Sequence, residues 1–524
     1  VGKDSLSMKT VWQEGTQQYS VTSPCSLVIT GVAPVTDVRN KLTPQLRTDI
    51  GESLLILIDL GRRKMRMGAS ACAQVTGQLR HGIAPDLDNV ADLSNFFKAI
   101  NTLRQQKLVY AYHDRSDGGV FTSLCEMAFA GRTGLALDLS KCLADEGQAV
   151  DYLFNEELGA VVQIKASDLE LVNNILSTHS LLDASAVIGT LTSGHTIEVK
   201  YNTASLFASE RAALHALWSK TSFEMQKLRD NPTCAHQEYD AIASDKLTEL
   251  TQQVSVQQQK LLVAPVIGAA HKVAILREQG VNGQIEMAAA FTRAGFIAVD
   301  VHMTDLLKGR IDLQDFTGLV ACGGFSYGDV LGAGSGWSNT ILFNAKLRAM
   351  FSRFFARGNT FTLGVCNGCQ MLAQLTELIP GSEHWPQFVA NESNQFEART
   401  VMTEIMPSPS IFFTDMAGMQ LPVVVAHGEG RARFNAAHTP EQVLTNQLAC
   451  MRYTGDSYPF NPNGSPLGIT GLTSTDGRVT ILMPHPERIF RQIQQSWRHS
   501  IDDDVDDSYW MAMFYNAARW VSAT

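Results

Sequence analysis

One cysteine, Cys366, has neighbours that suit nucleophilic chemistry. It lies in the segment 364–370 (GVCNGCQ), between a predicted short buried strand at 358–363 and a predicted helix at 371–375. A cysteine on a sharp strand-to-helix turn exposes its sulfur at the sheet edge. There the positive end of the helix stabilises a thiolate, and backbone N–H groups can bind an oxyanion. Glycines at 364 and 368 suit so tight a turn. We therefore predict that Cys366 is a nucleophile that needs a base.

A candidate base follows further along the chain, in the segment 480–490 (TILMPHPERIF). A β-rich run predicts a strand here, and His485 and Glu487 lie at its end. Pro484 and Pro486 restrict the local backbone. A spacing of two puts both side chains on the same side of an extended segment. We predict that Glu487 orients the His485 imidazole and that His485 takes the proton of the Cys366 thiol.

The pair Cys366 and Cys369 also has the spacing of a zinc or redox motif. A zinc site needs a second close pair, and the remaining cysteines of the chain are scattered singly. A thioredoxin-like redox pair would leave the His485–Glu487 element unexplained. The triad is therefore the favoured interpretation, and Cys369 is predicted to be a buried helix residue.

Alternating strands and helices surround this motif. Strands are predicted at 272–276, 296–301 and 318–322, with an amphipathic helix at 284–294, and a glycine-rich loop at 323–334 follows the third strand. This order predicts a parallel, doubly wound α/β sheet, whose ligands bind beyond the carboxyl ends of the strands. A phosphate-binding role for the loop is disfavoured because no Gly-Lys-Ser/Thr follows it.

The Gly-x-Cys-x-Gly-x-Gln turn and the Pro-His-Pro-Glu segment together resemble the class I (triad) glutamine amidotransferases. The resemblance implies that the thiolate attacks the glutamine side-chain amide, that ammonia leaves, and that water hydrolyses the thioester. It also implies oxyanion N–H groups from Gly324 and Asn367, and a place for Gln370 at the glutamine pocket. Segments 391–399 and 427–431 resemble elements bordering that pocket. His427 with Glu429 is a second His–carboxylate pair, ranked behind His485 and Glu487 because it lacks their strand-end placement.

The composition is that of an ordinary globular protein. The net charge is −10, 45% of residues are hydrophobic and 18% are charged. Since the chain has no basic stripe, no apolar run of membrane-spanning length and no signal peptide, we expect neither a nucleic-acid partner nor a membrane. Nine unpatterned cysteines indicate a reducing, cytoplasmic environment. The chain starts with Val1 and its opening segment already looks functional, so we expect an N-terminal portion of a longer protein to be missing.

The first 205 residues have a different character. Strands are predicted at 26–32 and 53–59 and a helix at 93–103, and a strand starting at 109 leads through 113–119 (HDRSDGG) into a helix at 120–130. Oxygen side chains before a glycine pair at a helix N-terminus suit a nucleotide–magnesium site, with helix N–H groups for phosphate. An ordinary capped helix start is the alternative, because Asp-Gly-Gly is also common turn chemistry.

Together with the opening segment 2–8 (GKDSLSM), this motif resembles an ATP-binding superfamily that includes aminoimidazole ribonucleotide synthetase. The order of synthetase region, helical linker and C-terminal glutaminase resembles the large, fused formylglycinamide ribonucleotide amidotransferases. That resemblance implies a ligase of purine synthesis, which uses ATP, Mg²⁺, glutamine and formylglycinamide ribonucleotide and is a monomer at full length. Asp114 is then a magnesium ligand and Ser116 a nucleotide contact of an auxiliary site, while Lys3 or Ser5 contacts phosphate or substrate.

We predict four parts: the end of an ATP-binding subdomain (1–46), an α/β companion subdomain (47–205), a helical linker (206–268) and the glutaminase (269–524). In the linker, helices are expected at 209–224 and 243–259, and Asn231-Pro232 is expected to end a helix. The acidic run 502–507 is expected to be a solvated loop, and 510–520 a docking helix. Two other functions remain open, a stand-alone thiol amidohydrolase on the same fold and a scaffold in which Cys366 is merely buried.

Overall fold

The protein is described by a computed structural model, which divides into two compact units, Val1–Leu42 and Thr43–Thr524. The residues that the structure describes are 2–6, 9–22, 26–35, 37, 41–79, 82–243, 253–265, 271–496 and 506–524. The first unit consists of two antiparallel strand pairs, β1 (Gly2–Leu6) with β4 (Ser26–Thr30) and β2 (Lys9–Glu14) with β3 (Gln17–Thr22). The side chains of Lys3 and Ser5, which were expected to contact phosphate or substrate, lie outside the described part.

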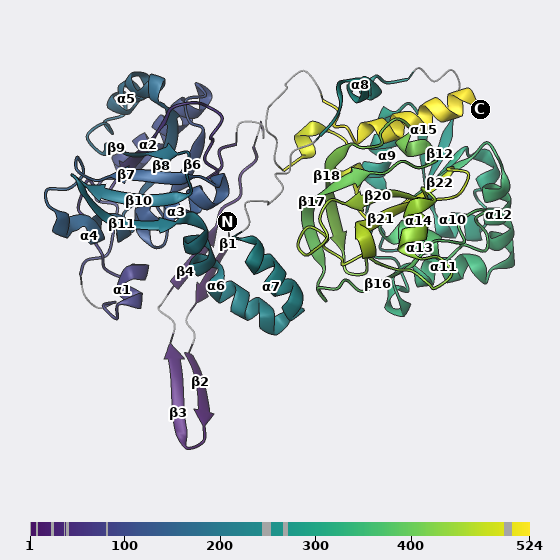
Figure 1. The fold of residues 1–524 in the computed structure, drawn as a ribbon, viewed down its shortest axis with the longest axis horizontal. Coiled ribbons are helices and arrows are strands. Elements are labelled where there is room, and N and C mark those ends of the chain that lie inside the picture. Colours follow the sequence, from purple (N-terminus) through teal and green to yellow (C-terminus); the bar gives the residue numbers. More distant parts are fainter. Residues whose placement is uncertain are drawn as a thin grey trace. The chain divides into compact units, whose positions relative to one another are not determined.

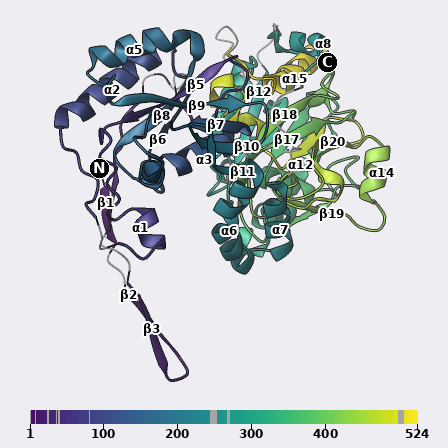
Figure 2. The same ribbon diagram turned by 60° about the vertical axis from the view of Figure 1, so that its left-hand side comes forward.

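The second unit begins with a seven-stranded sheet in the order β11-β10-β7-β9-β5-β8-β6 (Figure 1). Helices α2 and α5 pack together on one face and α3 lies on the other (Figure 2). The interior strand β5 is almost wholly buried, because strands cover both its edges and helices its faces. The strands are β5 (Ser53–Asp59), β6 (Ala111–Asp114), β7 (Gly134–Asp138), β8 (Gly159–Lys165), β9 (Ser185–Thr192), β10 (Thr196–Tyr201) and β11 (Ala204–Glu210). The helices are α1 (Ala71–Val75), α2 (Val90–Gln105), α3 (Gly119–Gly131), α4 (Ala149–Phe154) and α5 (Leu169–Thr178).

A hairpin of two helices, α6 (Arg211–Arg229) and α7 (Pro232–Ala241), follows this sheet. The predicted stop at Asn231-Pro232 is confirmed for α6. However, the same pair also starts α7, since Asn231 caps it and proline is well tolerated at a first helical position. The prediction of a helix at 243–259 is wrong in its described part. The chain turns after Ala241, and only Val256–Gln259 forms a short helix, α8; residues 244–252 lie outside the described part.

The hairpin contacts structure on both of its sides. The indole Nε1 of Trp218 on α6 donates to Oε1 of Glu126 on α3, over 3.0 Å. From α7, the side chain of Asn231 donates to the carbonyl of Glu392 over 2.8 Å. The α6–α7 hairpin therefore packs against both the seven-stranded sheet's helices and the C-terminal domain.

The C-terminal domain contains a nine-stranded sheet in the order β13-β12-β14-β15-β22-β21-β20-β17-β18. The first five strands are parallel and the remainder antiparallel, so the α/β class is confirmed but the predicted all-parallel sheet is wrong for half of it. A tight Asp476-Gly477 turn leads into β22, and such hairpins impose antiparallel pairing. The strands are β12 (Lys272–Arg277), β13 (Ile297–His302), β14 (Gly318–Ala321), β15 (Phe361–Val365), β17 (Glu397–Ile405), β18 (Gln420–His427), β20 (Ala449–Tyr453), β21 (Ile469–Thr473) and β22 (Val479–Leu482).

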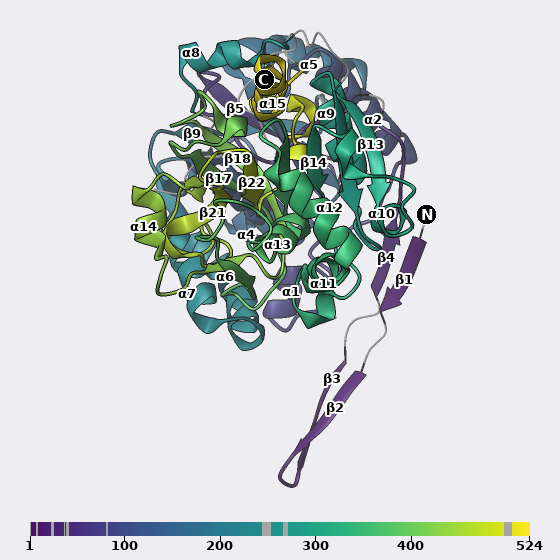
Figure 3. The same ribbon diagram turned by 90° about the vertical axis from the view of Figure 1, so that its right-hand side faces the viewer.

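Helices cover both faces of this sheet (Figure 3). On one face lie α9 and the C-terminal α15, and on the other lie α11, α12 and α13. The expected docking helix is confirmed as α15, which is buried along most of its length. The predicted solvated acidic loop agrees with the exposed Asp506 but is wrong for Asp507, which is mostly buried and pairs with Arg293. Residues 501–505 lie outside the described part. The helices are α9 (Gln284–Arg293), α10 (Met303–Leu307), α11 (Ser335–Leu342), α12 (Ala345–Ala356), α13 (Asn367–Ala373), α14 (Pro440–Thr445) and α15 (Met511–Ala523).

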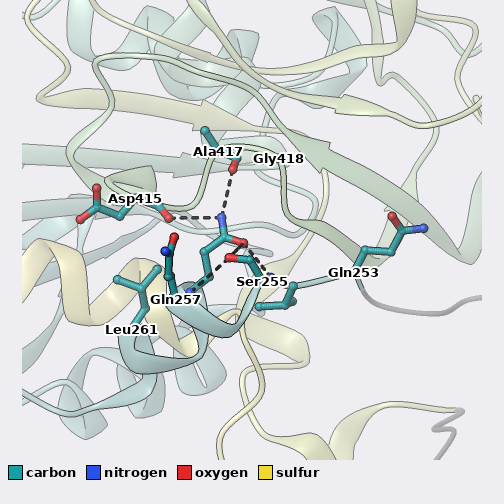
Figure 4. A pocket seen from close by; sticks show the side chains of 9 residues that line it. Gln253, Ser255, Gln257, Leu261, Asp415, Ala417 and Gly418 are labelled. Atoms are coloured by element: carbon teal, nitrogen blue, oxygen red, sulfur yellow. Dashed lines mark hydrogen bonds between the residues drawn. The ribbon is translucent and has the colours of Figure 1, made fainter.

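The short helix α8 fastens the end of the linker to the C-terminal domain (Figure 4). Gln253 pairs with Gln420 through two backbone hydrogen bonds, and the side chain of Gln258 donates to the carbonyls of Asp415 and Ala417. The groove beside α8 has a volume of about 880 Å³ and an open, polar lining of linker and loop residues. Asp415 is the one charged residue among the described residues of this lining, and the hydrogen bonds of Gln258 there hold the linker on the C-terminal domain.

Candidate functional site

The structure places Cys366 on the turn between β15 and α13. Its backbone has φ 53° and ψ −110°, a strained conformation for a residue with a side chain, and its N–H donates to the carbonyl of Leu482 on β22 over 2.8 Å. The glycines have a different role from the predicted one, because neither has a positive φ. A Cβ on Gly368 would lie 2.0 Å from the carbonyl oxygen of Ala321, so this glycine permits close packing of α13 on β14. The strain itself is held at Cys366.

His485 and Glu487 lie fully buried next to this turn. Nδ1 of His485 and Oε1 of Glu487 are 2.7 Å apart. The predicted reason for their proximity is wrong, because Pro486–Arg488 is a 3₁₀ turn and not an extended segment. Burial lowers the pKa of His485, but the charges of Glu487 and Cys366 outweigh burial and raise it to about 10. The buried ring is thus poised to hold a proton.

The side chains of Cys366 and His485 meet beside Gly323. A Cβ on this glycine would lie 2.5 Å from Cε1 of His485 and 3.2 Å from Cβ of Cys366. Nε2 of His485 has no hydrogen-bond partner among the described residues, and Sγ of Cys366 lies 3.6 Å from the carbonyl of Ala426. The geometry is that of a nucleophile, a base and an orienting carboxylate.

A cavity of about 460 Å³ opens beside Cys366. It is within the size range of small-molecule sites. The residues predicted for the oxyanion and glutamine contacts all line it. Gly324 has φ 134°, and the N–H of Asn367 is the first of α13, outside the helix's own hydrogen-bond ladder. The side chain of Gln370 donates to the carbonyl of Glu429 over 2.6 Å, so it supports the cavity wall.

A carboxylate in the glycine-rich loop, Asp329, was missed by the sequence analysis. One oxygen accepts from the hydroxyl of Ser326 (2.9 Å) and from the N–H of Gly334 (2.8 Å). The other accepts from the N–H of Ser326 (2.8 Å) and from the side chain of Asn367 (2.9 Å). Asp329 therefore fastens the loop that carries Gly324 to the turn that carries Cys366. Its position inside a glycine-rich loop was a signal that could have been used.

We expect Asp329→Ala to lower kcat/KM for the reaction at Cys366 by about 10- to 100-fold, because four hydrogen bonds that position the loop and Asn367 are lost. Steady-state rates with glutamine would measure this. Asp312→Ala is the matched control, since its carboxylate caps a short turn in the same domain away from the cavity. Equal rates for the two variants would contradict a positioning role of Asp329.

The second candidate pair, His427 and Glu429, is not a pair in the structure. Oε2 of Glu429 accepts from the N–H of Ala333 over 3.0 Å. Both ring nitrogens of His427 lack a hydrogen-bond partner in the described part of the chain. Burial, followed by the nearby His485, lowers the pKa of His427 to about 3. The sequence prediction placed His427 and Glu429 behind His485 and Glu487, and only the latter two are hydrogen-bonded to each other in the structure.

The buried neutral ring of His427 predicts acid instability. Its pKa falls from the ordinary 6.5 to about 3, so the unfolded chain binds a proton there that the folded chain excludes. Stability should be unaffected above pH 6.5 and should fall as the pH drops from 6.5 towards 3. The thermal unfolding midpoint measured at pH 7 and pH 4.5 should therefore differ less in His427→Phe than in the unmodified chain. An identical difference would contradict the buried, neutral ring.

The predicted nucleotide loop lies between β6 and α3. Asp114 and Ser116 are exposed, Oδ1 of Asp114 accepts from the Tyr112 hydroxyl over 2.5 Å, and the Ser116 hydroxyl donates to the Asp114 carbonyl. The expectation that N–H groups at this helix start bind phosphate is wrong for Gly118, which precedes α3, and for Gly119, its first residue. The N–H of Gly118 donates to Glu156, and the N–H of Gly119 donates to the carbonyl of Ser116.

Asp114 is the residue predicted to bind Mg²⁺. Among the described residues, no group of three His, Cys, Asp or Glu side chains is arranged to hold a metal ion. Mg²⁺ is commonly held by one or two carboxylates together with phosphates and waters. The exposed carboxylate of Asp114 fits such a shared metal–nucleotide site as one ligand, but the loop is not a metal site by itself.

Known protein families match several parts of the chain. Residues 270–521 match the CobB/CobQ-like glutamine amidotransferase domain. Residues 51–202 match the C-terminal domain of AIR synthase related proteins, and residues 1–34 match the FGAR-AT PurM_N-like domain. The chain thus contains a glutamine amidotransferase domain, with an AIR-synthase-related domain ahead of it. Its three matches give it the domain composition of a PurL-type FGAR amidotransferase, which confirms the family resemblance seen in the sequence.

Solved structures resemble parts of the chain. PurLQS from Thermotoga maritima is 22% identical, with a TM-score of 0.38, over 48% of this chain and 99% of that one. T. maritima PurL complexed with FGAR is 15% identical, with a TM-score of 0.27, over 34% of this chain and 30% of that one. A T. maritima glutamine amidotransferase is 17% identical, with a TM-score of 0.27, over 42% of this chain and 77% of that one. The chain thus spans about a third of the PurL structure.

Proposed function

We propose that this chain supplies the glutaminase and part of the synthetase of phosphoribosylformylglycinamidine synthase. That enzyme converts formylglycinamide ribonucleotide to the amidine, with glutamine as nitrogen donor and ATP as energy source. The observation that carries the proposal is the convergence of Cys366, His485 and Glu487 beside one cavity. The matched amidotransferase and synthetase-related domains support it. A stand-alone thiol amidohydrolase would leave the synthetase-related domain without a role.

In this proposal His485 removes the thiol proton and Sγ of Cys366 attacks the carboxamide carbon of glutamine. The oxyanion that forms accepts hydrogen bonds from the N–H groups of Asn367 and Gly324. When the C–N bond breaks, His485 returns the proton to the departing ammonia. Water then attacks the thioester with the same base, and glutamate is released.

The cavity also offers charges for an amino acid. Arg488 presents a guanidinium and Glu429 a carboxylate in its lining. A free amino acid carries an ammonium and a carboxylate on one carbon, so opposite charges on the wall suit its zwitterionic end. The carboxamide end then points towards Cys366.

The synthetase part of the proposal concerns ATP and magnesium. Asp114 would contribute one carboxylate to a metal bound by nucleotide phosphates, and Ser116 a hydroxyl to the same nucleotide. Bound there, the metal would neutralise phosphate charge. We place the enzyme in the cytoplasm and expect the upstream synthetase halves as partners in the same polypeptide, which forms a monomer. None of the helices in the described ranges is long and apolar enough to cross a membrane.

The test is glutamate release from L-glutamine by this chain and by Cys366→Ala. We expect release that requires the cysteine, together with selective labelling of Cys366 by 6-diazo-5-oxo-L-norleucine, a glutamine-shaped alkylating agent. Labelling without turnover would still support a glutamine site, one that needs the upstream chain for its rate. If there is neither release nor labelling, while iodoacetamide still reacts with Cys366, the proposed function is wrong.

A further inference from the structure

His427 is a buried polar side chain for which the protein supplies no partner. Its imidazole is 3% exposed, and it lines the cavity beside Cys366. Neither ring nitrogen has a hydrogen-bond partner among the described residues. A buried donor or acceptor that is left unpaired destabilises the protein, because it has lost its hydrogen bonds to water. The missing partner is therefore expected in the molecule that fills the cavity.

The ring is held firmly at the reacting end of the cavity. The preceding residue, Ala426, is the one whose carbonyl lies 3.6 Å from Sγ of Cys366. The side chain of Asn391 donates to the carbonyl of His427 over 2.7 Å and accepts from the N–H of Gly430 over 2.9 Å. A Cβ on Gly430 would lie 2.2 Å from Cε1 of the His427 ring, so the imidazole packs directly on this glycine.

The charge state of the ring decides what it can bind. Burial and the neighbouring His485 lower its pKa to about 3, so the imidazole is neutral near pH 7. A neutral imidazole presents one N–H donor and one lone-pair acceptor. The N–H groups of Asn367 and Gly324 already serve the carbonyl oxygen of a substrate. The N–H groups of a carboxamide need acceptors, and the acceptor nitrogen of His427 is one that no described protein group occupies.

We propose that His427 is a specificity-determining residue whose acceptor nitrogen binds the carboxamide N–H of the substrate. It thereby selects a primary amide over an ester of the same length. This inference rests on the proposed glutaminase function and extends it. Since the contact is made to the leaving nitrogen, it is absent when that nitrogen is replaced by an ester oxygen.

The test compares L-glutamine with L-glutamic acid γ-methyl ester, which keeps the carbonyl and the amino-acid end but lacks the N–H groups. For His427→Phe we expect kcat/KM to fall about 10- to 100-fold with glutamine, the loss of one hydrogen bond to a buried acceptor, and less than 3-fold with the ester. His427→Gln keeps an acceptor oxygen and should recover part of the amide preference. Equal losses for both substrates would show that His427 only supports the fold, and would overturn the inference.

Two further measurements keep the outcomes separate. His427→Leu repeats the test with a smaller side chain, in case phenylalanine overpacks the site. The rate of Cys366 modification by methyl methanethiosulfonate should be unchanged in every variant, because this thiol reagent has no carboxamide. If the unmodified chain hydrolyses neither substrate and is not labelled by the glutamine analogue, the proposed function fails and this inference with it. Turnover of both substrates with no change in the variants overturns the inference alone.

Discussion

Replacing Glu487 by alanine should lower kcat for glutamine hydrolysis by about 10³- to 10⁴-fold, with little change in KM. Glu487 is fully buried and its Oε1 lies 2.7 Å from Nδ1 of His485. Burial by itself lowers the pKa of His485, and the carboxylate is the foremost group that opposes burial. Without it, the protonated ring that forms when Cys366 loses its proton is left in a buried site with no counter-charge, and the ring is free to turn. Glutamate release at saturating glutamine measures the effect.

Glu377→Ala is the matched control for this substitution. Its carboxylate forms a bidentate ion pair with Arg348, but both groups are solvent-exposed, so activity should stay within about twofold. If Glu487→Ala keeps more than a tenth of the activity, Glu487 does not orient the base. Glu487→Gln separates charge from geometry, since it keeps an acceptor for Nδ1 without the negative charge.

The same pair predicts an alkaline change in stability. The pKa of His485 is raised from 6.5 to about 10, so its contribution to the free energy of unfolding is complete below pH 6.5. That contribution is lost as the pH rises through about 10. The unmodified chain should therefore lose more stability between pH 7 and pH 10 than Glu487→Ala, as measured by denaturant unfolding. An equal loss in both would mean that the carboxylate does not hold the proton on the ring.

The sequence was informative where a residue type and a local pattern coincide. The buried runs at Ser53–Asp59 and Lys272–Arg277 could be read directly, because strands covered on both faces are continuously apolar. The antiparallel half of the large sheet was missed. Its strands form by pairing between distant segments, such as β17 with β20, which no local pattern reports. The linker helix expected at 243–259 is wrong in its described part for a related reason. Gln253 and Gln258 form hydrogen bonds with residues of 415–420, a contact between distant segments.

For the candidate site, the residues that carry the chemistry could be named from their motifs, but not their supports. Cys366, His485 and Glu487 stand in short segments with a recognisable order of small, reactive and restrictive residues. Asp329 and Asn391 act through contacts to groups distant in the sequence, namely the side chain of Asn367 for Asp329 and the carbonyl of His427 for Asn391. Spacing alone could not show that. In the nucleotide loop the sequence predicted a phosphate contact that the structure does not leave open. The N–H of Gly118 donates to Glu156, which comes from a distant segment.

Gly323→Ala should abolish most of the activity at Cys366 while leaving the fold largely intact. A methyl group there would lie 2.5 Å from Cε1 of His485 and 3.2 Å from Cβ of Cys366, so the base, the nucleophile or the loop must move by several tenths of an ångström. Displacements of about 1 Å at reacting groups cost on the order of 10²-fold in rate, and here two groups share the displacement. We expect kcat/KM for glutamine to fall by at least about 10²-fold.

Gly358→Ala is the control that makes this result interpretable. It lies on an exposed turn before β15 in the same domain, and an added Cβ would meet no atom within 4 Å. Its activity should be unchanged, and its thermal midpoint should match or slightly exceed that of the unmodified chain, since alanine reduces the freedom of the unfolded state. If Gly323→Ala is as active as Gly358→Ala, the contact between the loop, Cys366 and His485 is looser than the structure shows. Loss of activity in Gly323→Ala, with a preserved midpoint and slowed iodoacetamide labelling of Cys366, would place the effect on the nucleophile itself.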